Sequence, residues 1–129
     1  MRSPYQIIAD HYEASKRHDL AAMMADISPE VQWTEMAGFP CAGTYRSVEE
    51  ITSHVFARLG LEWEHYTFEL EALHDAGNTV IGIGNYSGIY LQTGKSFKCR
   101  VAHVWQVEQG RVTGFEQFTD TLLVARAMQ

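Results

Sequence analysis

The first part of the chain carries apolar residues at helical spacing. Pro4 follows Ser3, and a helix is predicted to begin there because proline at the first helical position removes no hydrogen-bond donor that the helix needs. One face of this helix holds Tyr5, Ile8 and Tyr12. Asp19 is expected to cap a short second helix that extends to Ile27 and ends before Pro29.

A short strand is predicted next, because apolar and polar residues alternate over residues 31–35. Val31 and Trp33 define its buried side. Side chains two residues apart share one face of a strand, so Glu35 falls on the buried side as well. A carboxylate in that register makes Glu35 a candidate for proton chemistry.

The segment 36–45 is expected to be a loop, because it contains glycine and proline residues that favour turns. Ser47 followed by Glu50 has the spacing of a capping box, in which both side chains bind backbone N–H groups at the start of a helix. The helix predicted there buries an apolar face and ends at Gly60.

From Glu62 onward the chain has the pattern of strands joined by short turns. The turns are predicted at residues 75–78, 93–94 and 109–110. The strand between the last two turns alternates most cleanly, and His103 shares a face with Val101 and Trp105. After the final strand, Asp120 can cap a short C-terminal helix.

The turn at residues 93–94 sets an expected register for the middle hairpin. If this turn has two residues, Gly84 lies opposite His103 and Gly82 lies opposite Trp105. Small residues then face large ones, and glycine within strands permits the strong bend of a curled sheet.

The register of the last hairpin stays open at this point. A two-residue turn at residues 109–110 places Glu116 beside His103. A three-residue turn places Phe115 there and directs Gln117 inward. One residue of slip moves every side chain to the other face of the sheet.

These elements predict an α+β fold in which a highly curved, antiparallel-rich sheet wraps around the N-terminal helices. The concave side of such a sheet should hold a pocket. A length of 129 residues fits one domain that covers residues 1–129. Apolar residues make up 46% of the chain and aromatic ones 12%, which is enough for a substantial core.

The charge balance argues against nucleic acid as a partner. There are 16 acidic and 10 basic residues, and the largest basic group is Lys95, Lys98 and Arg100. No apolar run approaches the length of a membrane span. The N-terminal segment carries Asp10 and Glu13 and lacks the apolar core of a secretory signal. A cytoplasmic protein is therefore expected, and the two cysteines form no disulfide framework.

Several segments together point to a known family. They are Tyr12 with residues 18–23, and residues 31–35, 42–51 and 102–121. In these segments the chain resembles the SnoaL-like families, which are relatives of ketosteroid isomerase in the superfamily named for nuclear transport factor two. The resemblance implies a cone-shaped, cystatin-like α+β barrel with a deep apolar pocket, often assembled as a homodimer through the outer sheet face.

The resemblance also suggests roles for particular residues. The tyrosine of ketosteroid isomerase corresponds to Tyr12, and its base falls near Trp33 or, with a short slip, near Glu35. Its protonated aspartate falls at residues 102–103, where this chain has no carboxylic acid. The acid/base aspartate of the polyketide cyclases corresponds to Gln117, which cannot transfer protons usefully. Family members also include epoxide hydrolases, but none of the limonene epoxide hydrolase residues is kept in type.

The candidate catalytic residues are Glu35, His103 and Tyr12. Glu35 would be the general base, since burial raises a carboxyl pKa, while Tyr12 and His103 would stabilise an enolate. Ordinary structural roles compete with each: a solvated glutamate, a core histidine and helix packing. The expected substrate-binding residues are Trp33, Phe39, Phe56, Tyr86, Val101, Phe115 and Gln117. No cofactor is expected, and no metal, because the histidines lack metal-ligand spacing.

The predicted function is that of a cofactor-free enzyme that moves a proton next to a carbonyl of a small apolar substrate. Isomerase, aldol cyclase and dehydratase reactions share this step. The alternative is a non-catalytic ligand-binding or dimerisation module of the same fold, which the missing family carboxylates favour. In that case Ala102, Val104 and Phe118 on the outer face would carry the partner contact.

Overall fold

The sheet has six strands in the order β2-β1-β6-β5-β4-β3, in a computed structural model that describes all 129 residues. Neighbouring strands are antiparallel except β1 and β6, which are parallel. The strands are β1 (Ile27–Glu35), β2 (Gly43–Tyr45), β3 (Trp63–Ala76), β4 (Thr79–Tyr90), β5 (Ser96–Glu108) and β6 (Arg111–Thr119). The helices are α1 (Pro4–Lys16), α2 (Leu20–Met24), α3 (Val48–Ile51), η1 (Thr52–Phe56), α4 (Ala57–Glu62) and α5 (Thr121–Ala127).

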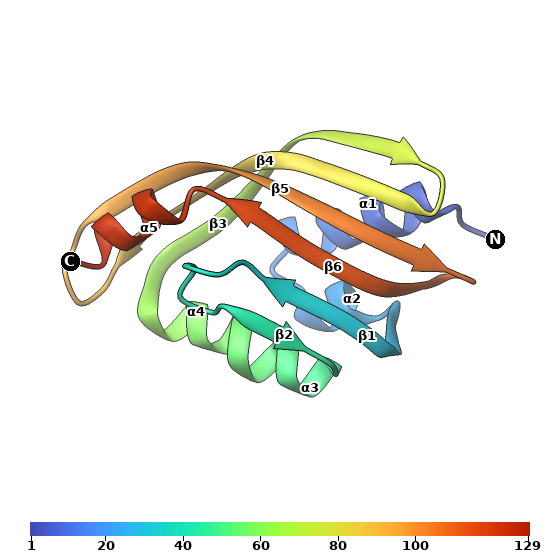
Figure 1. The fold of residues 1–129 in the computed structure, drawn as a ribbon, viewed down its shortest axis with the longest axis horizontal. Coiled ribbons are helices and arrows are strands. Elements are labelled where there is room, and N and C mark those ends of the chain that lie inside the picture. Colours follow the sequence, from blue (N-terminus) through green and yellow to red (C-terminus); the bar gives the residue numbers. More distant parts are fainter.

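The sheet is open and strongly curved, and the long strands β3, β4 and β5 bend across the molecule in Figure 1. Helices α1 and α2 lie behind these strands, and α3 leads through η1 into α4 as one continuous helix near β1 and β2. Apolar side chains of α1 pack with those of β1, β5 and β6 in the core. The α+β class with a curved, antiparallel-rich sheet is confirmed, although the sheet does not close into a barrel.

Side-chain caps begin the helices at the predicted positions. In each cap a side-chain oxygen accepts a hydrogen bond from the backbone N–H three residues later, and the capping residues are Ser3, Asp19, Ser47 and Asp120. Glu50 Oε1 accepts from the backbone N–H of Arg46, one residue before the position expected in a capping box.

None of the helices has both the length and the apolar composition that a membrane span requires.

The boundary between α2 and β1 differs from the prediction. Helix α2 ends at Met24, and Ile27 already lies in β1, where it pairs with Val112 of β6. The predicted loop at residues 36–45 also contains the short strand β2, which pairs with the end of β1. Both differences arise because backbone pairing with β6 and β2 extends the sheet beyond the predicted ends of β1.

The helix that starts at Val48 does not end at Gly60. It contains the π-helical turn η1 and continues through α4 to Glu62. Trp63 then adopts an extended backbone and is almost fully buried. The burial of Trp63 at the start of β3 therefore sets the end of the helix, and Gly60 remains within it.

The predicted register of the middle hairpin is wrong by two residues. Tyr90 pairs across the turn with Lys95, and its backbone N–H donates to the Lys95 carbonyl at 2.9 Å, so the loop has four residues instead of two. As a result His103 lies opposite Gly82. Because the error is an even number of residues, every side chain keeps its predicted face. A Cβ at Gly82 would lie 2.5 Å from the hydroxyl of Tyr12, so the missing side chain leaves room for that ring.

The last hairpin matches neither of the predicted registers. Its turn is the two-residue turn, but Thr113 forms a bulge between the pairs that Val107 and Gln106 make with β6. Beyond the bulge, Gln117 lies opposite His103 and is 1% exposed. Gln117 is therefore directed inward, as the three-residue turn predicted, but through a bulge that the sequence pattern does not reveal.

Gly82→Ala tests whether the close approach of Tyr12 to β4 requires a residue without a side chain at position 82. The added methyl group would displace the Tyr12 ring, and we expect the free energy of unfolding to fall by about 1–3 kcal/mol in urea denaturation. Gly88→Ala is the matched control on the same strand, because its Cβ would meet neighbours only at 3.4 Å or more. Equal losses in both variants would contradict this account.

Candidate functional site

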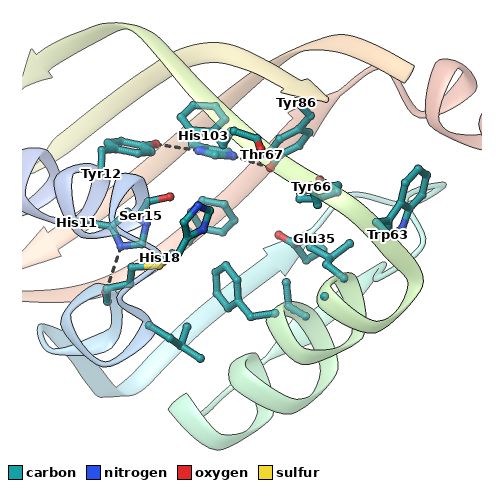
Figure 2. A pocket seen from close by; sticks show the side chains of 18 of the residues that line it. His11, Tyr12, Ser15, His18, Glu35, Trp63, Tyr66, Thr67, Tyr86 and His103 are labelled. Carbon is teal, nitrogen blue, oxygen red and sulfur yellow. Dashed lines mark hydrogen bonds between the residues drawn. The ribbon is translucent and has the colours of Figure 1, made fainter. Parts of the chain in front are cut away.

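A cavity of about 490 Å³ lies between the sheet and the helices, and 13 of its 21 lining residues are hydrophobic. Side chains from helices α1, α2, η1 and α4 and from strands β1, β3, β4, β5 and β6 form its wall (Figure 2). Its volume falls within the range of pockets that hold small organic ligands. No lysine or arginine lines it. The structure contains no cluster of three or more histidine, cysteine or acidic residues that could hold a metal ion.

Most of the sequence-predicted residues line this cavity. They are Tyr12, Trp33, Glu35, Phe56, Tyr86, His103 and Phe115. Phe39 and Val101 do not line it, although they pack in the core cluster that also contains the lining residue Tyr86. Gln117 also lies outside the lining, but its side chain reaches Tyr86 and Glu35 from behind.

Sequence reasoning did not assign several lining residues to the site. They include three histidines and three large aromatic residues: His11, His18, His65, Trp63, Tyr66 and Trp105. The alternation in β5 already placed Trp105 on the face of His103, which was a usable signal. Tyr66 and Phe68 alternate with the polar residues Thr67 and Glu69, so the sequence placed both on the apolar face of β3, which was a second usable signal.

A chain of hydrogen bonds runs through the buried side of the cavity. Tyr12 Oη lies 2.8 Å from His103 Nδ1, and Tyr86 Oη lies 2.7 Å from His103 Nε2. The indole N–H of Trp105 donates to Tyr12 Oη at 2.9 Å. The amide of Gln117 donates to Tyr86 Oη at 2.8 Å. Figure 2 shows His103 between the two tyrosines.

The orientation of the Gln117 amide is set by its second contact. The backbone N–H of Met36 donates to Gln117 Oε1 at 3.2 Å, so the other end of the amide must be the NH₂ group. The Tyr86 hydroxyl therefore accepts from Gln117, just as the Tyr12 hydroxyl accepts from Trp105.

This hydrogen-bond chain contains one donor proton more than the number of hydrogen bonds between His103 and the two tyrosines. Burial lowers the pKa of His103 to about 3, so the imidazole is neutral and has one N–H and one acceptor nitrogen. Burial raises the pKa of Tyr12 and Tyr86, so both hydroxyls keep their protons. Two hydroxyl protons and one imidazole proton serve only two contacts. One tyrosine O–H is consequently left to donate to another acceptor, and the tautomer of His103 decides which one.

Glu35 is the only acidic residue in the lining. It ends β1 and is 4% exposed. Burial raises the pKa of its carboxyl group to about 8, and the neighbouring Trp33 opposes this only in part, since its N–H makes no hydrogen bond of standard geometry. Gln117 Nε2 approaches Glu35 Oε1 at 3.5 Å, which is a weak contact. Glu35 is therefore mostly a neutral acid at pH 7 and ionises in mildly alkaline solution.

A family model described as a SnoaL-like domain matches residues 8–115. The chain belongs to the SnoaL-like family. This confirms the resemblance that the sequence segments suggested. None of the curated proteins compared with this SnoaL-like chain matches it in sequence.

Solved structures are similar to this SnoaL-like protein over most of its length. An NTF2-like protein from Burkholderia thailandensis is 73% identical, with a TM-score of 1.00 over 100% of this chain and 99% of that one. TerC, co-crystallised with polyporic acid, is 19% identical, with a TM-score of 0.86 over 98% of each chain. A protein with a ketosteroid isomerase-like fold from Catenulispora acidiphila, in complex with trimethylamine, is 15% identical, with a TM-score of 0.74 over 87% and 83%.

The pKa of Glu35 gives the SnoaL-like protein a characteristic pH dependence of stability. The folded-state pKa of about 8 lies above the ordinary value, so the folded protein binds the proton more tightly than the unfolded chain does. This stabilisation is present in acid and is lost as pH rises through 8. Between the unfolded-state and folded-state pKa values of Glu35, the free energy of unfolding falls by at most about 1.4 kcal/mol per pH unit.

Urea denaturation at several pH values from 5 to 9 checks this expectation. The stability of Glu35→Gln relative to the unchanged protein should increase over this range. Glu69→Gln, which removes an exposed carboxylate, is the control and should behave like the unchanged protein. A pH profile for Glu35→Gln parallel to that of the unchanged protein would show that Glu35 has an ordinary pKa.

Proposed function

We propose that the protein is a cofactor-free enzyme that binds a small apolar carbonyl compound and moves a proton on the carbon next to the carbonyl. The observation that carries this proposal is that Glu35 and a tyrosine O–H left free by the hydrogen-bond chain lie in the same apolar cavity. One group can take or give a proton, and the other can stabilise the negative charge that develops on oxygen.

The proposed reaction begins with Glu35 ionised. Its carboxylate takes the proton from the carbon next to the carbonyl, the C–H electron pair forms a carbon–carbon double bond, and the carbonyl oxygen becomes an enolate. Tyr12 or Tyr86 donates its free O–H to that oxygen, while His103 adopts the tautomer that frees the donor. In a substrate with a C=C bond next to that carbon the intermediate is a dienolate, and Glu35 returns the proton to its far carbon, so that the C=O bond re-forms and the C=C bond shifts into conjugation with it.

Aldol closure and dehydration would start from the same enolate and differ only in the later bond changes. In each case the raised pKa of Glu35 brings the base closer to the weak acidity of the carbon acid. The largely hydrophobic lining gives the cavity a low dielectric, which strengthens each hydrogen bond to the developing charge.

Relatives of the same fold support a small-molecule ligand for this cavity. TerC was co-crystallised with polyporic acid, and the Catenulispora acidiphila protein was crystallised with trimethylamine. These two ligands differ widely in size and chemistry. The fold therefore fits the proposal that this chain binds a small molecule, and the choice of ligand has to come from the residues of its own cavity.

A non-catalytic ligand-binding or dimerisation module is the second candidate. Glu35 is the single carboxylate in the lining, and Gln117 and His103 lie where family enzymes carry further acids. The outer face of the sheet also exposes Phe118 to 43%, with Val104 half-buried on the neighbouring strand. This face is where we propose that a second copy of the chain would bind.

Glu35→Gln tests the enzymatic proposal. We expect it to slow the exchange of deuterium from D₂O into the carbon next to the carbonyl of 1-tetralone by about 10²–10⁴-fold. NMR spectroscopy measures this exchange without any need to know the natural product. In the unchanged protein the rate should rise with pH through an apparent pKa near 8, as Glu35 ionises.

The matched control for this experiment is Glu69→Gln, which should leave the exchange rate unchanged. Thermal unfolding of Glu35→Gln must show that the variant still folds. Exchange by the unchanged protein no faster than by Glu35→Gln, together with retained binding of the ketone, would favour the non-catalytic module.

Val104→Lys tests the proposed homodimer. The lysine would place an unpaired charge in an apolar contact, while in the free chain it can pair with Glu116 on the neighbouring strand. We expect sedimentation analysis to show a dimer for the unchanged protein and a monomer for Val104→Lys, with an unaltered far-ultraviolet circular dichroism spectrum and a Tm lowered by the loss of the partner subunit. A dimer that survives the substitution would place the contact elsewhere.

A further inference from the structure

The hydrogen-bond chain around His103 can exist in two forms that differ in the tautomer of the imidazole. If Nδ1 carries the proton, Tyr86 donates to Nε2 and the O–H of Tyr12 is free. If Nε2 carries the proton, Tyr12 donates to Nδ1 and the O–H of Tyr86 is free. The two tautomers place the free donor at opposite ends of the chain, and the surroundings of the two tyrosines distinguish them.

The hydroxyl group of Tyr12 is enclosed by its neighbours. It accepts from the indole N–H of Trp105 at 2.9 Å and lies 2.8 Å from His103 Nδ1. It also lies against β4, since a Cβ at Gly82 would approach it to 2.5 Å. His103 Nδ1 is the only atom of the chain that can accept the Tyr12 proton, and a buried O–H without an acceptor is costly. This enclosure favours donation from Tyr12 to Nδ1.

The orientation of the rings agrees with this direction of donation. A phenol O–H lies near the plane of its ring, and the lone pair of a bare imidazole nitrogen lies in the imidazole plane. The ring planes of Tyr12 and His103 are 4° apart, so the proton and the lone pair can align. The ring planes of Tyr86 and His103 are 50° apart. That tilt suits an imidazole N–H that donates to a hydroxyl oxygen, because oxygen accepts over a broad range of directions.

Tyr86 lies at the end of the chain that is nearer Glu35. Gln117 Nε2 donates to Tyr86 Oη at 2.8 Å and approaches Glu35 Oε1 at 3.5 Å, so the two oxygens share a neighbour. Burial raises the pKa of both tyrosines, and the charge of Glu35 raises the pKa of Tyr86 only. In Figure 2 the row from Tyr12 through His103 to Tyr86 leads toward the side of the cavity that carries Glu35. A free O–H on Tyr86 therefore lies on the side of the proposed base.

We propose that the hydrogen-bond chain runs in one direction, from Tyr12 through the Nε2–H tautomer of His103 to Tyr86, whose O–H is the donor presented to the ligand. This inference deepens the proposed function and rests on it, with Tyr86 as the catalytic residue that donates to the enolate oxygen. Tyr12, which the family resemblance places in that role, is then a positioning residue that acts through His103. Because Tyr86 accepts from both Gln117 and His103, its own O–H becomes a stronger donor.

NMR spectroscopy of the ¹⁵N-labelled protein at pH 7 tests the tautomer without any ligand, because protonated and bare imidazole nitrogens differ widely in chemical shift. We expect His103 to be protonated at Nε2 and bare at Nδ1. Its signals can be assigned through contacts with the ring of Phe68, whose centroid lies 4.6 Å away.

His11 is an internal reference in the same spectrum. Burial lowers its pKa to about 4, so it is also neutral at pH 7. Its Nδ1 lies 3.1 Å from the backbone carbonyl of Met23, which can only accept a hydrogen bond. His11 must therefore be protonated at Nδ1 and show the opposite pattern to the one expected for His103.

Two phenylalanine variants compare the tyrosines in the deuterium-exchange assay. Tyr86→Phe removes the proposed donor and should slow the exchange into 1-tetralone by about 10²–10³-fold. Tyr12→Phe keeps that donor and removes only its cooperative support, so the loss should stay below about tenfold. Tyr5→Phe, which removes an exposed hydroxyl outside the cavity, is the control and should leave the rate unchanged.

Infrared spectroscopy of bound 1-tetralone measures the same hydrogen bond without turnover. A donor at the carbonyl oxygen lowers the C=O stretching frequency. Tyr86→Phe should remove most of this lowering, whereas Tyr12→Phe should keep most of it. A merely structural role of Tyr86 would leave the frequency of the bound ketone unchanged.

Protonation of His103 at Nδ1 in the folded protein would overturn the proposal, even if Tyr86→Phe failed to fold. A loss of exchange in Tyr12→Phe as large as that in Tyr86→Phe would also contradict it. The proposed function and this inference can fail separately. Absence of exchange in the unchanged protein would remove the function and leave the tautomer as measured, while Glu35-dependent exchange with Nδ1 protonated would remove only the inference.

Discussion

The neutral imidazole of His103, held between two tyrosine hydroxyls, is the interaction on which the interior of this protein depends. It joins Tyr12 on α1 to Tyr86 on β4, and Gln117 continues the connection to β6 and to the backbone of Met36 after β1. These contacts lie in a low-dielectric interior, where a lost partner leaves a costly unsatisfied group. The helix and the strands are thereby fixed in one arrangement, and the cavity takes its shape from it.

The same physical effect sets the protonation of both titratable groups on which the proposed chemistry depends. Removal from water disfavours the charged form, so His103 gives up its proton while Glu35 keeps one near neutral pH. Both side chains are therefore mostly uncharged at pH 7, although one is a base and the other an acid. With no lysine or arginine in the lining, the neutral forms are favoured near neutral pH, and Glu35 ionises only in mildly alkaline solution.

Much of the fold could be predicted from residue patterns, because capping residues and period-two alternation act locally. The inward direction of Glu35 and His103 could be inferred from their neighbours two residues away. The hairpin registers could not be predicted, since the four-residue loop before Lys95 and the bulge at Thr113 leave no mark on the alternation. Tyr66 was missed as a lining residue although it shares the apolar face of β3 with Phe68, since alternation shows which face is buried but not which of its residues reach the cavity.

All three tryptophans of this chain line the cavity. Indole emission and near-ultraviolet circular dichroism are sensitive to the polarity and the aromatic contacts around each ring. No tryptophan elsewhere adds a constant background, so the tryptophan emission of the folded protein comes from the cavity wall. The protein thus carries its own spectroscopic reporter of occupancy, and an added molecule can be detected without a label.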